Sequence, residues 1–238
     1  MMIDKDFLKL KAAEIGIELS SESLDRFDKY AEMLVETNKT LNLTAITEPD
    51  EIVTKHFCDC LSLLKEVEIP QGAKLIDVGT GAGFPGVVLL IARPDLKITL
   101  MDSTNKRLVF VQSVVDALGL KANVVHSRAE EAGKNPAFRE KYNFVTARAV
   151  ANMQTLSEYC LPFLKVGGLF AAMKGAKASD ELSVAKGAIK ILGGQIYSAK
   201  EFNLFDCGER SILCVKKISQ TPSKYPRPSA QIAKKPLA

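Results

Sequence analysis

The stretch LIDVGTGAGFPGVVLL, residues 75–90, runs from an apolar, strand-like segment into a turn with glycines at positions 79, 81, 83 and 86. Glycines at this density indicate a backbone that adopts left-handed conformations or passes very close to another group, because a Cβ atom would clash in either case. A bound ligand is the first explanation for such a turn. Close packing of the strand against the following helix is the plainer alternative.

Two ligand-binding templates fit the turn. Residues 81–86 read GAGFPG and match the G-x-G-x-x-G of dinucleotide-binding domains, whereas residues 77–83, DVGTGAG, match the acidic-x-G-x-G-x-G turn of S-adenosylmethionine-dependent methyltransferases. Both templates place the ligand at the carboxyl end of the first strand, beside the start of the next helix. Both also require an acidic residue after the second strand to hold ribose hydroxyls, and Asp102 satisfies either one.

Three features favour the methyltransferase template. Asp77 lies inside the first strand, where a buried carboxylate is costly unless it is hydrogen-bonded, so we expect it to order the glycine turn or to reach the ligand's amino group. The third strand ends in VVHSRAEE, which puts Ala129 and Glu130 where an adenine edge could meet a backbone N–H and a carboxylate. A hairpin that closes the sheet is the third feature, since nicotinamide domains do not usually have one.

The organisation outward from the turn predicts an α/β fold. Residues 3–66 have helical patterns throughout, and from Lys74 onward apolar strand segments alternate with helices, which is typical of a parallel sheet covered on both faces. The last two strand segments, GQIYSAKEF and RSILCVKK, are close enough to form an antiparallel hairpin. The prediction is therefore a Rossmann-like fold with a seven-stranded, mostly parallel sheet.

The chain divides into three predicted parts. Residues 1–70 form an N-terminal helical extension, residues 71–217 form the α/β domain, and residues 218–238 form a basic tail that contains proline. Because the tail has four prolines in its last twenty residues and no apolar period, we expect it to be extended or disordered until it binds a partner.

Composition excludes several classes of protein. Of 238 residues, 47% are apolar and 25% are charged, which is ordinary for a globular protein, and no apolar run approaches the ~20 residues that span a bilayer. The N-terminus lacks the apolar core of a signal peptide, so we expect a cytoplasmic location and no membrane partner. Five cysteines without a C-x-x-C pair predict neither a metal site nor a disulfide framework. His56 and His126 are expected to be partly buried packing residues.

Charge is distributed unevenly. Residues 1–70 carry 15 acidic and 8 basic side chains, whereas residues 210–238 carry 7 basic and no acidic ones. A basic cluster of this kind is consistent with a nucleic-acid contact or with a solubilising tail.

Several further segments carry a family resemblance: LNLTAI (41–46), KHFCDCLSLL (55–64), LMDSTNKRLVFV (100–111), SRAEE (127–131), YNFVTARAVANM (142–153), LPFLKVGGLFAAMKG (161–175) and TPSKYPRPSAQIAKKPL (221–237). Together with the glycine turn, they make the chain resemble the bacterial small-subunit ribosomal RNA guanine-N7 methyltransferases, a family also called glucose-inhibited division protein B. The resemblance covers almost the whole chain. It implies the class I methyltransferase fold, S-adenosylmethionine as the cofactor, and small-subunit (16S) ribosomal RNA or an assembling small ribosomal particle as the partner.

The resemblance also implies site residues. Added to the template residues Asp77 and Gly81, the cofactor-binding residues are Gly79, Phe84, Asp102, Ser103, Thr104, Ala129, Glu130 and Arg148. The candidates for RNA contacts are Lys174, Arg210, Lys224, Tyr225, Arg227, Lys234 and Lys235. The basic side chains would neutralise phosphates, and Tyr225 would offer a stacking face to an unpaired base.

The motifs also limit the chemistry. Exocyclic amine methylation usually uses an Asn/Asp-Pro-Pro-aromatic loop after the fourth strand, where this chain has ARAVAN, and Cys160 is not in the Pro-Cys setting of a pyrimidine-C5 nucleophile. Guanine N7 carries a lone pair and no proton, so its methylation needs no general base, and alignment of the reactants can be worth ~7–11 kcal/mol. No catalytic residue is assigned, although Arg148 is a candidate. An NAD-dependent oxidoreductase and a non-catalytic RNA-binding module are the alternatives.

Overall fold

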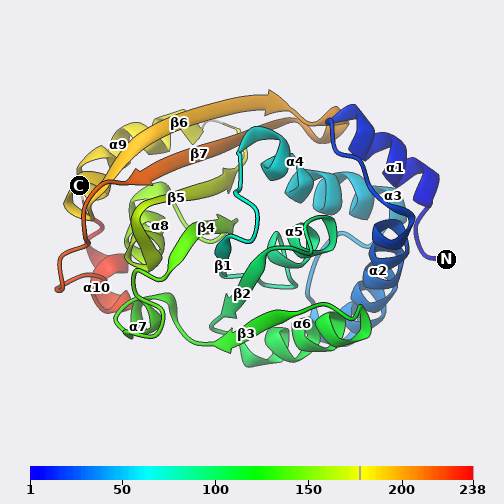
Figure 1. Ribbon diagram of the computed structural model, residues 1–238, viewed down its shortest axis with the longest axis horizontal. Helices are drawn as coiled ribbons and strands as arrows, with labels where there is room; N and C mark the ends of the chain where they lie inside the picture. The colour runs from blue at the N-terminus through cyan, green and yellow to red at the C-terminus, as the bar shows by residue number, and fades with distance from the viewer. Residues whose placement is uncertain (177, 238) are drawn as a thin grey trace.

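The computed structural model describes residues 1–176 and 178–237 and contains one seven-stranded sheet, whose place in the molecule is seen in Figure 1. The strands lie in the order β3-β2-β1-β4-β5-β7-β6. Their bounds are β1 Lys74–Val78, β2 Lys97–Asp102, β3 Ala122–His126, β4 Tyr142–Arg148, β5 Leu164–Lys174, β6 Gly194–Asn203 and β7 Glu209–Lys217. Strands β1 to β5 pair in parallel, and β7 is antiparallel to both β5 and β6. The predicted mostly parallel sheet with a terminal hairpin is confirmed.

Helices cover both faces of this sheet. Those before the sheet are α1 (Lys5–Glu14), α2 (Ser21–Leu41), α3 (Pro49–Glu51), the π-helical turn η1 (Ile52–Cys58) and α4 (Asp59–Glu66). The others are α5 (Gly86–Ala92), α6 (Asn105–Ala117), α7 (Ala129–Ala132), α8 (Met153–Cys160), η2 (Leu161–Phe163), α9 (Ala178–Ile191), η3 (Phe205–Cys207) and α10 (Ser229–Lys234). Figure 1 shows α1, α2 and α3 at the end of the molecule near the N-terminus and α7 to α10 at the opposite end.

The apolar core consists of two clusters, one on each face of the sheet. Leu75 faces a cluster that includes Phe27 of α2 and Phe57 of η1, whereas its neighbour Ile76 faces a second cluster built on α8 and α9. Successive residues of a strand point to opposite faces, so one buried strand supplies both clusters. The N-terminal helices therefore share their apolar core with one face of the sheet.

The C-terminal tail is ordered against the body, so its predicted extended or disordered state is wrong. The Arg139 guanidinium donates hydrogen bonds to the carbonyl oxygens of Thr221 (2.6 Å) and Tyr225 (2.9 Å). Arg227 donates from Nη2 to the fully buried Glu158 carboxylate at 2.7 Å, and Ile232 of α10 is completely buried. Proline removes backbone donors but leaves the carbonyl acceptors, and these are captured by side chains remote in the sequence.

The described residues do not meet the requirements of a membrane-spanning helix or of a metal site. No helix within residues 1–176 and 178–237 combines the length and the apolar character that crossing a membrane requires. In the same residues, no three His, Cys, Asp or Glu side chains gather in a way that could hold a metal ion, and all five cysteines are free thiols.

Candidate active site at the carboxyl edge of the sheet

A cavity of about 750 Å³ opens where β1, β2, β4 and β5 end. One end of it is lined by the glycine turn, Asp102 and Glu130. The other end is lined by Lys55 and Asp59 of the N-terminal helices and by Arg210 of β7. The cavity is therefore built jointly by the α/β sheet and by the helices that precede it.

The glycine turn has the backbone that its sequence predicts. Gly79 and Gly81 adopt φ angles of +75° and +59°, where a side chain would be strained, and a Cβ at Gly81 would point into open space. Asp77 Oδ2 accepts hydrogen bonds from Thr80 Oγ1 (2.6 Å) and from the Gly86 N–H (2.9 Å). Asp77 thus ties the two ends of the turn together, the first of the two roles that the sequence suggested.

The other oxygen of Asp77 is unusual. Oδ1 is buried and has no hydrogen-bond partner among the described residues. Burial raises the pKa of the Asp77 carboxyl to about 6, although the bonds from Thr80 and Gly86 oppose this shift. Asp77 does not line the cavity, so this unsatisfied acceptor lies in the core behind the glycine turn, where it costs stability.

Asp102 fixes the same turn from the end of β2. Its Oδ2 accepts from the Gly81 N–H (2.9 Å) and its Oδ1 accepts from the Thr104 N–H (2.8 Å). A carboxylate has about four lone-pair directions, so two remain for the hydroxyls of a ribose. Ser103 lines the cavity beside it, whereas Thr104 contributes only its backbone.

The adenine end predicted from the third strand also lies at the cavity. Ala129 and Glu130 begin α7 and line the wall, and Glu130 is only 9% exposed. Tyr159 of α8 lines the same region, which the sequence did not indicate. Of the ten predicted cofactor residues, all except Asp77 and Thr104 line this one cavity.

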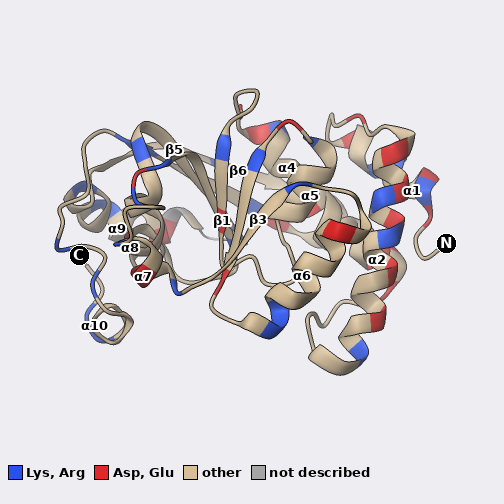
Figure 2. Ribbon diagram, turned by 60° about the horizontal axis from the view of Figure 1, so that its bottom comes forward, with Lys and Arg blue, Asp and Glu red and all other residues tan. Residues whose placement is uncertain are grey.

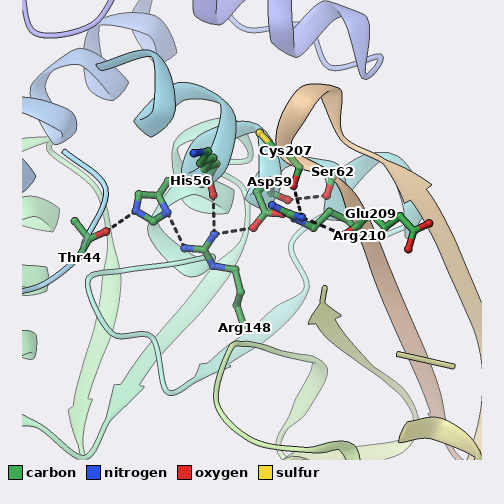
Figure 3. Close-up of polar contacts among 9 residues, drawn as sticks. Thr44, His56, Asp59, Ser62, Arg148, Cys207, Glu209 and Arg210 are labelled. Carbon is green, nitrogen blue, oxygen red and sulfur yellow. Dashed lines mark hydrogen bonds and ion pairs between the residues drawn. The ribbon is translucent and has the colours of Figure 1, made fainter. Parts of the chain in front are cut away.

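A polar network fills the opposite end (Figure 3). Asp59 accepts from Arg148 Nη1 through Oδ2 at 2.7 Å and from Arg210 Nε through Oδ1 at 2.8 Å. Arg148 also donates from Nη2 to His56 Nδ1 at 3.3 Å, and Nε2 of His56 lies 2.8 Å from the hydroxyl of Thr44. One carboxylate of the N-terminal helices therefore holds two arginines, one from β4 and one from β7.

His56 is neutral in this network. Burial, followed by the charge of Arg148, lowers its pKa to about 3. The imidazole stacks on Phe84 with ring centroids 4.5 Å apart, so it does pack as predicted, yet it also lines the cavity. His126, by contrast, is exposed at the end of β3 and is not the partly buried residue that we expected.

The N-terminal helices supply further residues that the sequence analysis missed. Tyr30 of α2 is fully buried and donates its hydroxyl proton to the Ala82 carbonyl oxygen at 2.6 Å, so it supports the glycine turn from behind. Tyr30, His56 and Asp59 all lie on helices, whereas the predicted cofactor residues lie at or just after the ends of strands. The available signal was the segment KHFCDCLSLL (55–64), which contains His56 and Asp59.

The residues proposed for RNA contacts divide into two groups. Lys174 and Arg210 line the cavity, and Lys174 Nζ contacts the Glu181 carboxylate at 2.7 Å. The other five lie on the C-terminal tail, where the ribbon in Figure 2 is blue at Lys and Arg and the sequence has no Asp or Glu. Lys224, Lys234 and Lys235 are exposed.

Two tail residues do not have the environment that their predicted role requires. Tyr225 is 7% exposed and packs into the core cluster with α8 and α9, so the predicted stacking face for a base is not accessible. Arg227 is bound by Glu158, which makes it an anchor of the tail. Periodicity could not reveal either environment, because both depend on segments that are distant along the chain.

Comparison with known proteins gives a consistent result. A family model described as rRNA small subunit methyltransferase G matches residues 23–212. The ribosomal RNA small subunit methyltransferase G of Desulforamulus reducens is 47% identical over 97% of each chain. That of Lactobacillus johnsonii is 49% identical over 94% of this chain and 96% of its own.

Solved structures show the fold. A SAM-dependent O-methyltransferase from Thermotoga maritima superposes with a TM-score of 0.53 at 14% identity, over 79% of this chain and 72% of its own. TrmN from Thermus thermophilus gives a TM-score of 0.53 at 16% identity, over 70% of this chain and 53% of its own.

Proposed function

The chain belongs to the rRNA small subunit methyltransferase G family, and on that premise we propose that it methylates N7 of a guanine in small-subunit (16S) ribosomal RNA. The proposed methyl donor is S-adenosylmethionine. Membership of this family and the methyltransferase fold do not favour the NAD-dependent oxidoreductase. A non-catalytic RNA-binding module is the alternative that the experiment below addresses.

The observation that carries the proposal is the continuity of the cavity, from the glycine turn to the arginines on Asp59. The residues of the first end fit the proposed cofactor: Asp102 offers lone pairs to ribose hydroxyls, and Glu130 offers an acceptor to an adenine amino group. When bound, S-adenosylmethionine supplies an electrophilic methyl group on a sulfonium. A base that enters the other end would then lie beside it, with its nucleophile aligned by the cavity walls.

The acid–base state of the lining residues supports a nucleophile without a proton. Both ring nitrogens of His56 have hydrogen-bond partners, and a pKa of about 3 makes it a very weak base at neutral pH. Both oxygens of Asp59 accept from arginines. An exocyclic amine has to lose a proton after methylation, whereas guanine N7 does not, so the described residues suit N7 better.

The arginine pair suits a guanine or its phosphate. Arg210 lines the cavity with its Nε on Asp59 and its Nη1 on backbone carbonyl oxygens, and its guanidinium carries further N–H donors. Such a donor could bind the O6 atom beside N7 or a phosphate oxygen. Methylation leaves a cationic purine, and the Asp59 carboxylate offsets part of the positive charge that would otherwise oppose it.

The test is incubation of the full chain with methyl-labelled S-adenosylmethionine and, separately, 16S ribosomal RNA or small ribosomal subunits that lack the modification. Nuclease digestion and mass spectrometry should place the label in 7-methylguanosine. The Asp102→Ala variant should incorporate much less label. Label in a different nucleoside would contradict N7 as the acceptor, and no label with either substrate would favour the RNA-binding module. Calorimetry with S-adenosylmethionine and with NAD checks the cofactor independently.

A further inference from the structure

Four lysines gather at the edge of the sheet opposite to the active-site cavity. Lys74 and Lys97 are the first residues of β1 and β2, and Lys121 and Lys141 immediately precede β3 and β4. All four side chains are exposed, and all four line one hollow of about 860 Å³. We call these residues the amino-edge lysines.

The strand register places three of them in a row. Lys74 on β1 pairs directly with Lys97 on β2, and Ile98 pairs with Ala122, so Lys97 lies beside Lys121. Neighbouring strands are ~4.8 Å apart, and residues at the same register of parallel strands point to the same face. Lys74 and Lys97 are thus carried by adjacent strands on one side of the sheet, and Lys121 follows next to Lys97 just before β3, an arrangement in which like charges repel.

The chain compensates for this repulsion only in part, because the carboxylates of Asp95 and Asp116 line the same hollow. No amino-edge lysine forms an ion pair with any of the side chains that the structure describes. The two carboxylates that line the hollow have other partners. Asp95 accepts from Arg93 Nε at 2.7 Å and from the Gly72 N–H at 2.8 Å, whereas Asp116 accepts from Gln112 Nε2 at 2.8 Å.

We propose that the amino-edge lysines are a second RNA-binding surface, which contacts phosphates of a segment distant from the methylated guanine. This inference rests on the proposed RNA substrate. A lysine ammonium is a point charge that neutralises phosphate without reading sequence, and a row of them matches a polyanion better than a single small anion. A five-residue strand such as β1 spans ~17 Å, so RNA that contacts both edges has to pass around the sheet, as a large folded RNA can.

The test compares two variants that each lose four charges. One replaces Lys74, Lys97, Lys121 and Lys141 by Gln, and the control replaces the exposed residues Lys9, Lys65, Lys186 and Lys190 by Gln. For the amino-edge variant we expect RNA affinity to fall at least tenfold at low salt. The slope of log K against log[salt] should become shallower by about 2 to 3, since each lost phosphate contact on a single strand contributes ~0.7.

Other measurements separate this result from damage to the protein. The amino-edge variant should bind S-adenosylmethionine with unchanged Kd, retain kcat at saturating RNA, and melt at a temperature equal to or above that of the wild type, because a repulsive row has been removed. A salt slope equal to that of the control variant would overturn the inference, whatever the affinity. If the wild type does not methylate RNA, the proposed function is wrong. If the wild type methylates RNA but the amino-edge variant and the control variant have the same salt slope, only the inference about the amino-edge lysines is wrong.

Discussion

The carboxylate of Asp59 lies 2.7 Å from Nη1 of Arg148, and this contact joins the N-terminal helices to the carboxyl end of β4. Its second oxygen holds Arg210 at the start of β7. The two arginines of the candidate site are therefore positioned by a residue outside the sheet. The acidic N-terminal helices complete the cavity in addition to burying one face of the sheet.

Replacing Asp59 by Asn should impair the use of RNA without weakening the binding of S-adenosylmethionine. The change leaves two guanidinium groups without their carboxylate, and because these side chains are only partly buried we expect a loss of about 2 kcal/mol in stability. Misplaced arginines should lower kcat/KM for RNA by roughly 10- to 100-fold, equivalent to 1.4–2.8 kcal/mol. The Kd for S-adenosylmethionine should stay within about twofold, as calorimetry would show. Asp50→Asn, at an exposed position, is the control. An equal loss in binding of both substrates would contradict separate roles for the two ends of the cavity.

Replacing Asp102 by Ala should weaken cofactor binding by roughly 10- to 100-fold, because a charged hydrogen bond is worth about 1.5–3 kcal/mol. This change also removes the hydrogen-bond acceptor of the Gly81 and Thr104 N–H groups, so we expect the glycine turn to become less rigid. Asp102→Asn keeps one oxygen and should have a smaller effect. Calorimetry with S-adenosylmethionine measures the affinity of the Asp102→Ala and Asp102→Asn variants, and Asp116→Ala is the control. Unchanged affinity in the Ala variant would remove Asp102 from the site.

Replacing Arg227 by Ala should detach the tail and destabilise the fold. The change removes the guanidinium from Glu158, which is completely buried and keeps only the backbone N–H of residue 227 (2.8 Å), and breaking a buried ion pair from one side costs about 3–5 kcal/mol. Urea denaturation should show this loss. Lys235→Ala, at an exposed tail position, should change stability by less than about 0.5 kcal/mol. Equal stability of the two variants would mean that the tail is not anchored by Arg227.

Asp77 predicts a pH dependence of stability with a definite sign. Its pKa rises from 3.8 to about 6 on folding, so between these values the folded chain retains a proton that the unfolded chain has released. The contribution of this group is fully present below about pH 3.8 and is lost by about pH 6, a change of roughly 3 kcal/mol. Asp77→Asn removes the titration. The unfolding free energy of this variant, relative to the wild type, should therefore rise by about that amount from pH 4 to pH 7. A difference independent of pH would contradict the buried carboxyl.

The rate of methyl transfer should vary little between about pH 6 and 8, because guanine N7 loses no proton and His56 stays neutral throughout. Single-turnover rates at saturating substrates would measure this directly. His126→Asn, which alters the exposed histidine, should leave the profile unchanged. A limb of unit slope with a midpoint near pH 6.5 that disappears in a His56→Asn variant would show that His56 acts as a base.

The sequence by itself determined the sheet and the glycine-turn end of the cavity. Asp77, Gly79 and Asp102 lie at the ends of strands whose apolar pattern is local, and parallel strands bring their carboxyl ends to one edge. The glycine positions likewise predicted the left-handed turn, because glycine has no Cβ and adopts positive φ angles without a clash. These features could be read because their causes lie within a few residues along the chain.

Only the tertiary structure decided the rest. Asp59 and Arg148 are 89 residues apart and Glu158 and Arg227 are 69 apart, and a pairing between two side chains leaves no periodic trace in either segment. The same holds for the lysines of β1 and β2, which meet because of strand register. Hydrogen bonds and charges act over a few ångströms in space, whatever the separation along the chain, so the network on Asp59 and the anchored tail became visible only once the chain was folded.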